Sequence, residues 1–203
     1  MRPISCIVAV LGLLVPVLVH AGVPDPRHST IPAYMLVCPD GGFTQTINVR
    51  DVNNSPLNGV DVVIDFCAFP TFHLCTADPG DPYTIQSGCV VHVLTNAIGN
   101  ANLPIRAGGG ASGLIEISAN GVFLGYALSA ASPDQNASGI VDAADAALLA
   151  AKIGTFAPPS DLNLDGHVDA ADAAILTAHL GHACAAPTPV RAATWGQVRQ
   201  AYR

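Results

Sequence analysis

Two segments of the chain repeat one another in residues that suit a hard metal ion. DQNASGIVDAADAALLAAKIG begins at Asp134, and DLNLDGHVDAADAAILTAHLG begins 27 residues later, at Asp161. Each segment opens with Asp-x-Asn-x-(Ser/Asp)-Gly and has Asp at position twelve. Calcium takes about six to eight oxygen ligands, which a loop of this kind supplies from alternating positions. The repeat therefore predicts two Ca²⁺ sites, in the loops 134–145 and 161–172.

The predicted ligands occupy equivalent places, which are loop positions one, three, five, seven, nine and twelve. In the first loop these are Asp134, Asn136, Ser138, Ile140 (through its carbonyl), Asp142 and Asp145. In the second they are Asp161, Asn163, Asp165, His167 (through its carbonyl), Asp169 and Asp172. Position six must turn sharply, and glycine at both loops permits it. Because Ser138 replaces an acidic residue at position five, we expect the second site to be the stronger.

Each loop must be followed by a helix that carries position twelve. Apolar residues recur at helical spacing after both loops. They are Val141, Ala144, Leu148 and Ala151, then Val168, Ala171, Ile175 and Ala178. Gly154 and Gly181 lie where C-terminal caps are expected, and Pro158-Pro159 separates the two units. Helices this short and Ala-rich should pack on each other, with calcium supplying part of the folding energy.

The paired loop–helix units, with Asp at position twelve and no obvious helix before each loop, resemble a dockerin domain over residues 134–181. The resemblance implies a small all-α calcium-binding domain, which we place at 132–184, with a cohesin-like protein domain or a cell-surface component as its partner. It also implies that positions ten and eleven contact the partner and that binding in two orientations is permitted. Both copies have Ala-Ala there, which favours the alternative of a purely structural calcium module without a cohesin partner.

The region before the repeat has short β-type runs separated by turn signals. The runs are AYMLVC, FTQTINVRDV, GVDVVIDF, VVHVLT, LPIRA, GLIEISA and VFLGYAL. Asn120-Gly121 predicts a hairpin between the last two, and Gly108-Gly109-Gly110 reads as a turn. We therefore expect an all-β sandwich over residues 22–131, with 22–33 as a lead-in. GVDVVIDF, TNAIGNANLPI and GLIEISANGVFL resemble bacterial immunoglobulin-like and carboxypeptidase-regulatory-like modules, which implies an immunoglobulin-like spacer or adhesive unit.

Residues 67–89 interrupt the strand rhythm and hold three cysteines and three prolines. They read as a long loop pinned by a disulfide, either a recognition site or a structural decoration. Five cysteines follow the first 21 residues: Cys38, Cys67, Cys75, Cys89 and Cys184. An odd number leaves at least one thiol unpaired or paired between molecules, and the spacing leaves the pairing open.

The chain ends carry signals of a different kind. A basic start, an apolar run and Val19-His20-Ala21 predict a signal peptide over residues 1–21 and a secreted protein. The run is shorter than the roughly 20 residues that span a bilayer, so we expect no membrane span after cleavage. Loss of Arg2 takes the formal charge from −7 to −8, which argues against nucleic acid as a partner. The tail 185–203, with the one Trp, is either a docking or sorting helix or a frayed end.

The chain has no H-E-x-x-H, no G-x-S-x-G and no phosphate-binding glycine loop before a helix, so we expect no enzyme. The competing hypothesis is a small carbohydrate-binding or carbohydrate-active domain that uses Asp61, Asp65 or Glu116. Three histidines in or after the second unit either form a soft-metal site or are solvated; they are His167, His179 and His182. The leading interpretation is a secreted, non-catalytic calcium-binding protein for protein–protein assembly or cell-surface attachment.

Overall fold

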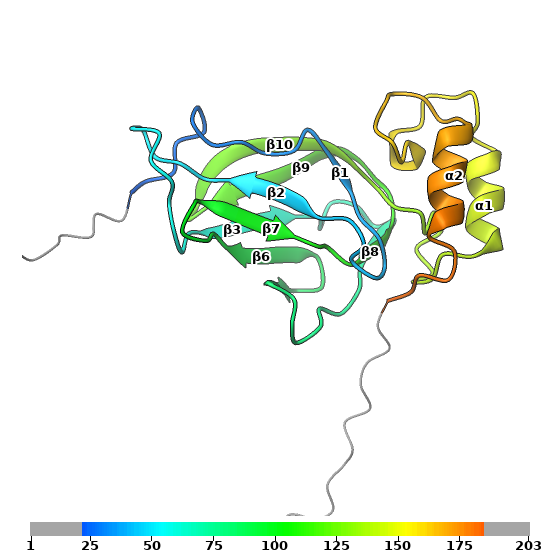
Figure 1. Ribbon diagram of the computed structural model, residues 1–203, viewed down its shortest axis with the longest axis horizontal. Coiled ribbons are helices and arrows are strands. Elements are labelled where there is room, and N and C mark those ends of the chain that lie inside the picture. The colour runs from blue at the N-terminus through cyan, green and yellow to red at the C-terminus, as the bar shows by residue number, and fades with distance from the viewer. Residues whose placement is uncertain (1–21, 185–203) are drawn as a thin grey trace, which may run out of the picture.

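A computed structural model describes residues 22–184 of the chain, and the predicted signal peptide and tail lie outside that range. A β-rich region comes first and two short helices follow it, side by side beyond one end of the sheets (Figure 1). Within the described residues, no helix is long and apolar enough to cross a bilayer. A β domain followed by a small helical unit is the order that the sequence predicts.

Six strands form the main sheet, in the spatial order β1-β10-β9-β3-β6-β5. Their bounds are β1 Tyr34–Leu36, β10 Val122–Ala131, β9 Ala111–Ala119, β3 Asp61–Asp65, β6 Val90–Leu94 and β5 Tyr83–Gln86. β1 runs parallel to β10, and the other neighbours are antiparallel. The long β10 strand leads directly into the calcium-loop region, so the sheet positions the first loop.

Two smaller sheets complete the β domain. β2 (Gln45–Asn48) pairs with β7 (Asn100–Leu103), and β4 (Phe72–Leu74) pairs with β8 (Ala107–Gly109). Figure 1 shows β2 and β7 lying over the main sheet, and alternating residues such as Ile47, Val62 and Ile117 join one buried core. The predicted β domain is thus confirmed, while its immunoglobulin-like class stays a prediction.

The strands and turns predicted from local sequence are confirmed only where strand pairing between distant segments agrees with them. The β9–β10 hairpin turns at Asn120-Gly121, as predicted, with both residues at positive φ. The runs AYMLVC and FTQTINVRDV do contain strands, β1 and β2, but these lie in different sheets. The prediction of a turn at Gly108-Gly109-Gly110 was wrong, because the first two of these glycines belong to β8, which pairs with β4.

The cysteine-rich segment is more ordered than the predicted loop. It contains β4 and β5, which form because each finds a partner strand elsewhere in the chain. The predicted bridge within it joins Cys67 and Cys89. Cys75 pairs instead with Cys184, far along the chain, and Cys38 is buried without a disulfide partner among the described residues. The second bridge fastens the helical end of the chain to the β domain.

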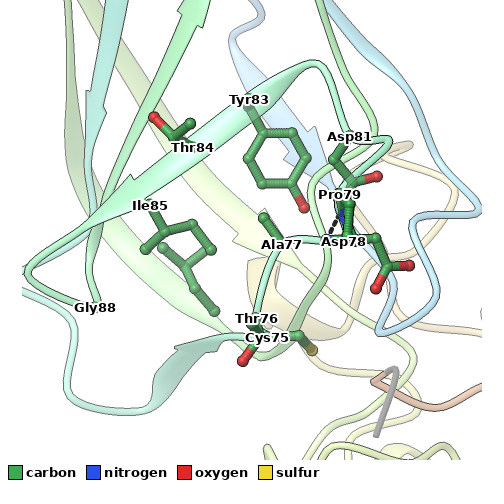
Figure 2. A pocket seen from close by; sticks show the side chains of 11 residues that line it. Cys75, Thr76, Ala77, Asp78, Pro79, Asp81, Tyr83, Thr84, Ile85 and Gly88 are labelled. Carbon is green, nitrogen blue, oxygen red and sulfur yellow. Dashed lines mark hydrogen bonds between the residues drawn. The ribbon is translucent and has the colours of Figure 1, made fainter. Parts of the chain in front are cut away.

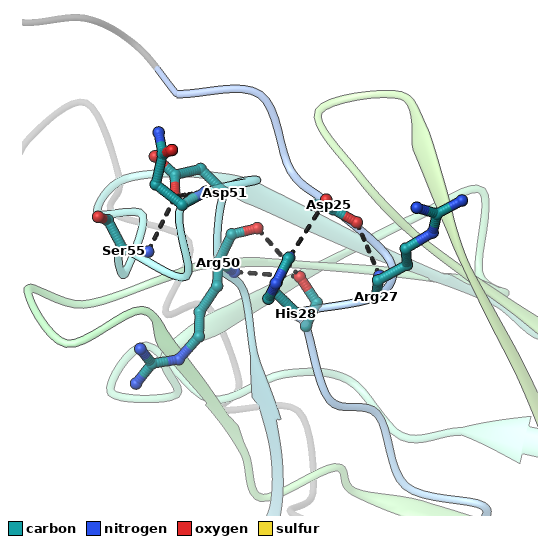
Figure 3. A network of polar contacts seen from close by, with 8 residues as sticks. Asp25, Arg27, His28, Arg50, Asp51 and Ser55 are labelled. Atoms are coloured by element: carbon teal, nitrogen blue, oxygen red, sulfur yellow. Dashed lines mark hydrogen bonds and ion pairs between the residues drawn. The ribbon is translucent and has the colours of Figure 1, made fainter.

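The lead-in, residues 22–33, lies along the edge of β2 rather than apart from the domain. Asp25 N donates to the Arg50 carbonyl at 2.8 Å, and Thr30 exchanges backbone hydrogen bonds with Asn48. Figure 3 shows the polar network that fixes this path, in which the Asp25 carboxylate accepts from Arg27 N and meets His28. The amide of Arg27 lowers the pKa of Asp25, and His28 adds to that effect.

The helical unit contains α1 (Ala143–Ala150), a 3₁₀ turn (Pro158–Ser160) and α2 (Ala170–Ala178). The predicted apolar stripe was wrong beyond Val141 and Val168: the alanines assigned to it are exposed, and Leu148 is 41% exposed whereas Leu149 is 1% exposed. The reason lies in Asp145, which turns inward to close its loop. The residue four places on, Leu149, shares its helix face and is buried with it. The same holds for Asp172 and Leu176 in α2.

Candidate metal centre

Residues 132–184, called here the two-loop module, fold both predicted calcium loops into the same backbone. Position four has a positive φ in each, 58° at Ala137 and 61° at Leu164. Position six does too, 85° at Gly139 and 93° at Gly166. Left-handed backbone is unfavourable for residues with a Cβ, so its recurrence at position four shows that the two loops are built alike.

The carboxylate at position one organises each loop from inside. Asp134 accepts hydrogen bonds from the amides of Ser138 at 3.0 Å and Gly139 at 2.8 Å. Asp161 accepts the corresponding bonds from Asp165 at 3.1 Å and Gly166 at 2.8 Å. These bonds turn the following backbone around the carboxylate, which therefore sits at the centre of the loop.

The carboxylate at position twelve closes each loop from the helix. Asp145 accepts from Asn136 N at 3.1 Å and from Asp142 N at 2.8 Å. Asp172 accepts from Asn163 N at 3.1 Å and Asp169 N at 2.7 Å. The second contact in each loop belongs to a capping box, because position nine caps the helix in return. The first turn of each helix thus ties both ends of its loop together.

The buried charge of these four carboxylates is what a cation would balance. Asp134, Asp145 and Asp172 are 0% exposed and Asp161 is 7% exposed. Within residues 22–184 no ion pair involves any of the four. Burial raises the pKa of Asp134, and the nearby Asp145 charge raises it further against the loop amides. Burying unpaired charge is costly, so the donor set fits a bound calcium ion in each loop.

The one Lys or Arg side chain within the two loops and the chain between them does not balance the buried carboxylates. Lys152 is the only Lys or Arg between Asp134 and Asp172. Its Nζ donates to Ser160 Oγ at 2.8 Å and to Gln135 Oε1 at 3.2 Å, and burial lowers its pKa. Lys152 therefore joins the starts of the two loops through neutral partners and leaves the carboxylates to another cation.

The remaining side-chain donors form an exposed rim, and here the loops differ. Ser138 Oγ donates to the Ile140 carbonyl at 3.1 Å, which is itself a predicted ligand. In the second loop, Asp165 occupies the same position and accepts from His167 N at 2.9 Å and Asn163 Nδ2 at 2.8 Å. The His167 amide and the Asn163 side chain lower the pKa of Asp165. The second loop thus has one more ionised oxygen donor.

The two units bind each other reciprocally. Gly154, after α1, donates its N–H to the Val168 carbonyl in the second loop at 2.8 Å. Gly181, after α2, donates to the Val141 carbonyl in the first loop, also at 2.8 Å. Both valines, with Leu149, Leu162 and Leu176, form the module's own buried core. The end of each helix therefore hydrogen-bonds to the loop of the other unit, and the two units pack together as predicted.

The module also packs closely on the β domain, through contacts that the sequence analysis missed. Ser132 Oγ donates to the Ala107 carbonyl of β8 at 3.1 Å, and Gly109 N donates to the Asp134 carbonyl at 2.6 Å. A Cβ at Gly108 would collide with the Asp134 carboxylate, and one at Gly110 with Pro159. Glycine at these three positions lets the backbone at and just after β8 lie directly against its neighbours. A run of three glycines was the sequence signal that could have indicated this close packing.

Comparison with known families agrees with this geometry. Residues 132–181 match the family model of the dockerin type I domain. Domains of this family bind calcium, and they are protein–protein assembly modules with cohesin partners. No curated protein and no solved structure matches the chain. The match covers the two-loop module, so the β domain is characterised by its fold alone.

The three acids proposed for carbohydrate chemistry do not share a described cavity. Asp65 and Glu116 are cross-strand neighbours on β3 and β9, both exposed on the open face of the sheet. Asp61, also on β3, pairs with His92 Nδ1 at 3.0 Å. Asp61 lines a hollow of about 350 Å³ together with Asp81 and His92, whereas neither Asp65 nor Glu116 lines a described cavity. Paired carboxylates for glycoside chemistry must flank a bound sugar, and no two of the three proposed acids line the same described cavity.

The largest described hollow, about 540 Å³, lies within the cysteine-rich segment, between residues 74–79 and β5 (Figure 2). Its two acids, Asp78 and Asp81, pair with Arg106 at 2.8 Å and 3.0 Å. Tyr83 accepts a hydrogen bond from Arg106 N, and burial raises its pKa to about 12. These groups hold the segment against the domain, and both carboxylates already share the Arg106 guanidinium.

The three histidines of the second unit separate into two places. His167 lies exposed in the second loop. His179 and His182 lie beyond α2 and meet the Cys38 thiol of the β domain. The expected soft-metal group of three histidines did not include Cys38, because 144 residues separate it from His182.

Proposed function

We propose that the chain is a secreted, non-catalytic calcium-binding protein whose two-loop module attaches it to a cohesin-like protein domain. The observation that carries the proposal is the repeated loop itself. Both copies bury paired carboxylates within the same hydrogen-bond network, and no described cation balances them. The family match of residues 132–181 supports the choice of partner class.

The partner surface, on this proposal, is the outer face of the two helices. Positions ten and eleven are exposed in both units, at Ala143-Ala144 and Ala170-Ala171. Ala147 and Ala174 continue this face at equivalent places one turn on, and both are exposed. The face offers small apolar groups rather than hydroxyls, so recognition would depend on close helix packing. Because the units are alike, either helix can present the same surface.

Cohesin domains encoded in the same genome provide the direct test. Each is immobilised and the purified protein is passed over it with calcium and then with a chelator. We expect binding that requires calcium, because the loops hold the first turns of both helices through their capping boxes. Absence of binding to every such cohesin would reject the partner and leave the calcium sites unaffected.

Two substitutions examine the orientation of binding. Ala147→Arg and Ala174→Arg each obstruct one helix, so either alone should weaken binding only about two-fold if the orientations are equivalent. The double variant should abolish binding. His73→Ala, at an exposed position of β4, is the matched control and should bind normally. If one single variant abolishes binding, only one helix is used.

A second candidate is a purely structural calcium module. Two observations favour it: the Ala-Ala pairs at the recognition positions, and the disulfide and glycine contacts that fix the module to the β domain. Under this alternative, calcium raises the melting temperature of the whole described unit and no cohesin binds. A hydrolase screen on polysaccharides tests the non-catalytic part, and activity lost in Glu116→Ala would reject it.

A further inference from the structure

The turn after β1 and the chain after α2 bring a second set of metal-binding groups together. Cys38, His179 and His182 each place a ligand atom within 4.8 Å of those of the others. His182 Nδ1 lies 3.7 Å from Cys38 Sγ and 2.7 Å from Asp40 Oδ2. None of these groups belongs to the calcium loops, and a thiol with two imidazoles is a donor set for a softer ion than calcium.

The backbone holds both sides of this cluster in place. Cys38 starts a turn closed by the hydrogen bond from Gly41 N to its carbonyl, at 2.9 Å. His182 N donates to the His179 carbonyl at 3.0 Å, and its own carbonyl accepts from Val141 N at 2.8 Å. The disulfide at Cys184 fixes the chain two residues later. The cluster is therefore held by regular structure on both sides.

His179 is oriented as a metal ligand would be. Its Nδ1 hydrogen-bonds the Ile175 carbonyl at 2.8 Å, so Nδ1 carries the proton and Nε2 keeps its lone pair. The ring packs against Phe43, with centroids 4.6 Å apart, and against His182 at 4.9 Å. A backbone carbonyl behind the ring and an aromatic beside it are typical supports of an imidazole ligand.

We propose that Cys38, His179 and His182 form a Zn²⁺ site that joins the β domain to the two-loop module, with the Asp40 carboxylate as the hydrogen-bond partner of His182 beside it. Tetrahedral zinc, with bonds of about 2.3 Å to sulfur and 2.0 Å to nitrogen, separates a sulfur ligand from a nitrogen ligand by about 3.5 Å. The Cys38 Sγ to His182 Nδ1 distance is close to that value. One thiolate and the adjacent carboxylate balance the ion's charge, so the bound site is neutral.

A thiol nucleophile is the competing explanation, and the geometry disfavours it. Cys38 is 0% exposed, and one nitrogen of His182 contacts both Cys38 and Asp40, whereas a catalytic triad uses the two ring nitrogens separately. Asp40 and His182 are about one-third exposed, which gives an ion access from solvent.

Zinc titration of the purified protein tests this site, with calcium present in excess so that the loops are filled. Calorimetry should show one zinc ion per chain. Cys38→Ser and His182→Ala should each lose detectable zinc binding, Asp40→Asn should weaken it about 10- to 100-fold, and His73→Ala should bind as the unmodified protein does. Near-ultraviolet circular dichroism verifies the fold of each variant.

Cobalt(II) gives an independent readout, since a thiolate ligand produces a sulfur-to-cobalt charge-transfer band. The band should appear in the unmodified protein and be absent in Cys38→Ser, and if that variant fails to fold, His182→Ala should show the band weakened or absent. No zinc binding under calcium, or unchanged binding in both Cys38→Ser and His182→Ala, would overturn the proposal. Neither result affects calcium binding, which is measured separately.

Discussion

The two loops of the module are nearly the same in sequence and hydrogen bonding, but they differ in charge and in surroundings. The first loop has Ser138 at position five and lies directly against β8, with Cys184 beside Gly139. The second has Asp165 there, and a hollow of about 170 Å³ lies between it and residues of β1 and β10. The repeated sequence gives both loops the same backbone geometry, whereas contacts from the β domain determine how strongly each loop is restrained.

The difference between the loops separates calcium affinity from restraint by the β domain. Affinity follows the charge and number of oxygen donors, which favours the second loop. Restraint by the rest of the protein favours the first, because the disulfide and the glycines of β8 act on it. We therefore expect the second loop to bind calcium more tightly and the first to report on the junction with the β domain.

The largest effect on calcium binding should come from removing the carboxylate at loop position twelve. Asp145→Ala and Asp172→Ala each delete a buried carboxylate that a bound ion and at least two backbone amides share. We expect each variant to lose its own site, at least about 100-fold in affinity or about 2.7 kcal/mol, and to keep the other. Calcium titration followed by calorimetry measures this. The control is Asp65→Ala, an exposed acid outside the module, and loss of both sites from one substitution would show that the loops are not separate.

Removing the long-range disulfide should affect the first loop more than the second. Cys75→Ser with Cys184→Ser opens a link between residues 109 apart, which should cost about 2–5 kcal/mol of folding free energy. Because Cys184 N also donates to the Gly139 carbonyl, calcium affinity should fall mainly in the first loop. Denaturant unfolding and calcium titration are the measurements. Equal loss at both loops would contradict the idea that the junction restrains only one.

Gly108→Ala should produce a smaller effect of the same kind. Its added methyl group would collide with the Asp134 carboxylate, so the first loop must shift at a cost of about 1–3 kcal/mol. Gly80→Ala is the matched control, because a Cβ there meets nothing within 4 Å. Thermal unfolding with and without calcium compares them. A stable Gly108→Ala protein with normal first-loop affinity would show that the close contact is unimportant.

Exchanging the residues at loop position five should have the smallest effect, and it mainly tests the charge of the ligand set. Ser138→Asp adds a carboxylate and removes the hydroxyl bond to the Ile140 carbonyl, so first-loop affinity should rise about tenfold, or about 1.4 kcal/mol. Asp165→Ser should lower second-loop affinity by a similar factor. Titration of each variant and of the double exchange provides the check. If the order of the two affinities does not change in the double exchange, position five is not what separates the loops.

The sequence could predict the loops because their chemistry is local. Asp134, Gly139 and Asp145 lie within twelve residues, so spacing alone places them around one point. The same is true of the hairpin at Asn120-Gly121, which depends on four residues and their neighbours. Where a feature depends on adjacent residues, the pattern was enough to predict it.

Features that depend on distant partners could not be predicted in this way. The glycines of β8 look like a turn until β4 and the first loop are in place. Cys38 looks like an ordinary odd cysteine until α2 brings His179 and His182 to it. The helix stripe failed for a different, local reason: Asp145 closes its loop from inside, so the buried face of α1 carries Leu149 rather than Leu148.

Calcium titration of the calcium-stripped protein, followed by calorimetry, tests the central claim most directly. Two binding events should appear, and Asp161→Ala should remove the tighter one while the weaker event remains. Asp134→Ala should do the reverse. Absence of calcium binding, or a tighter event that survives Asp161→Ala and disappears in Asp134→Ala, would contradict the account.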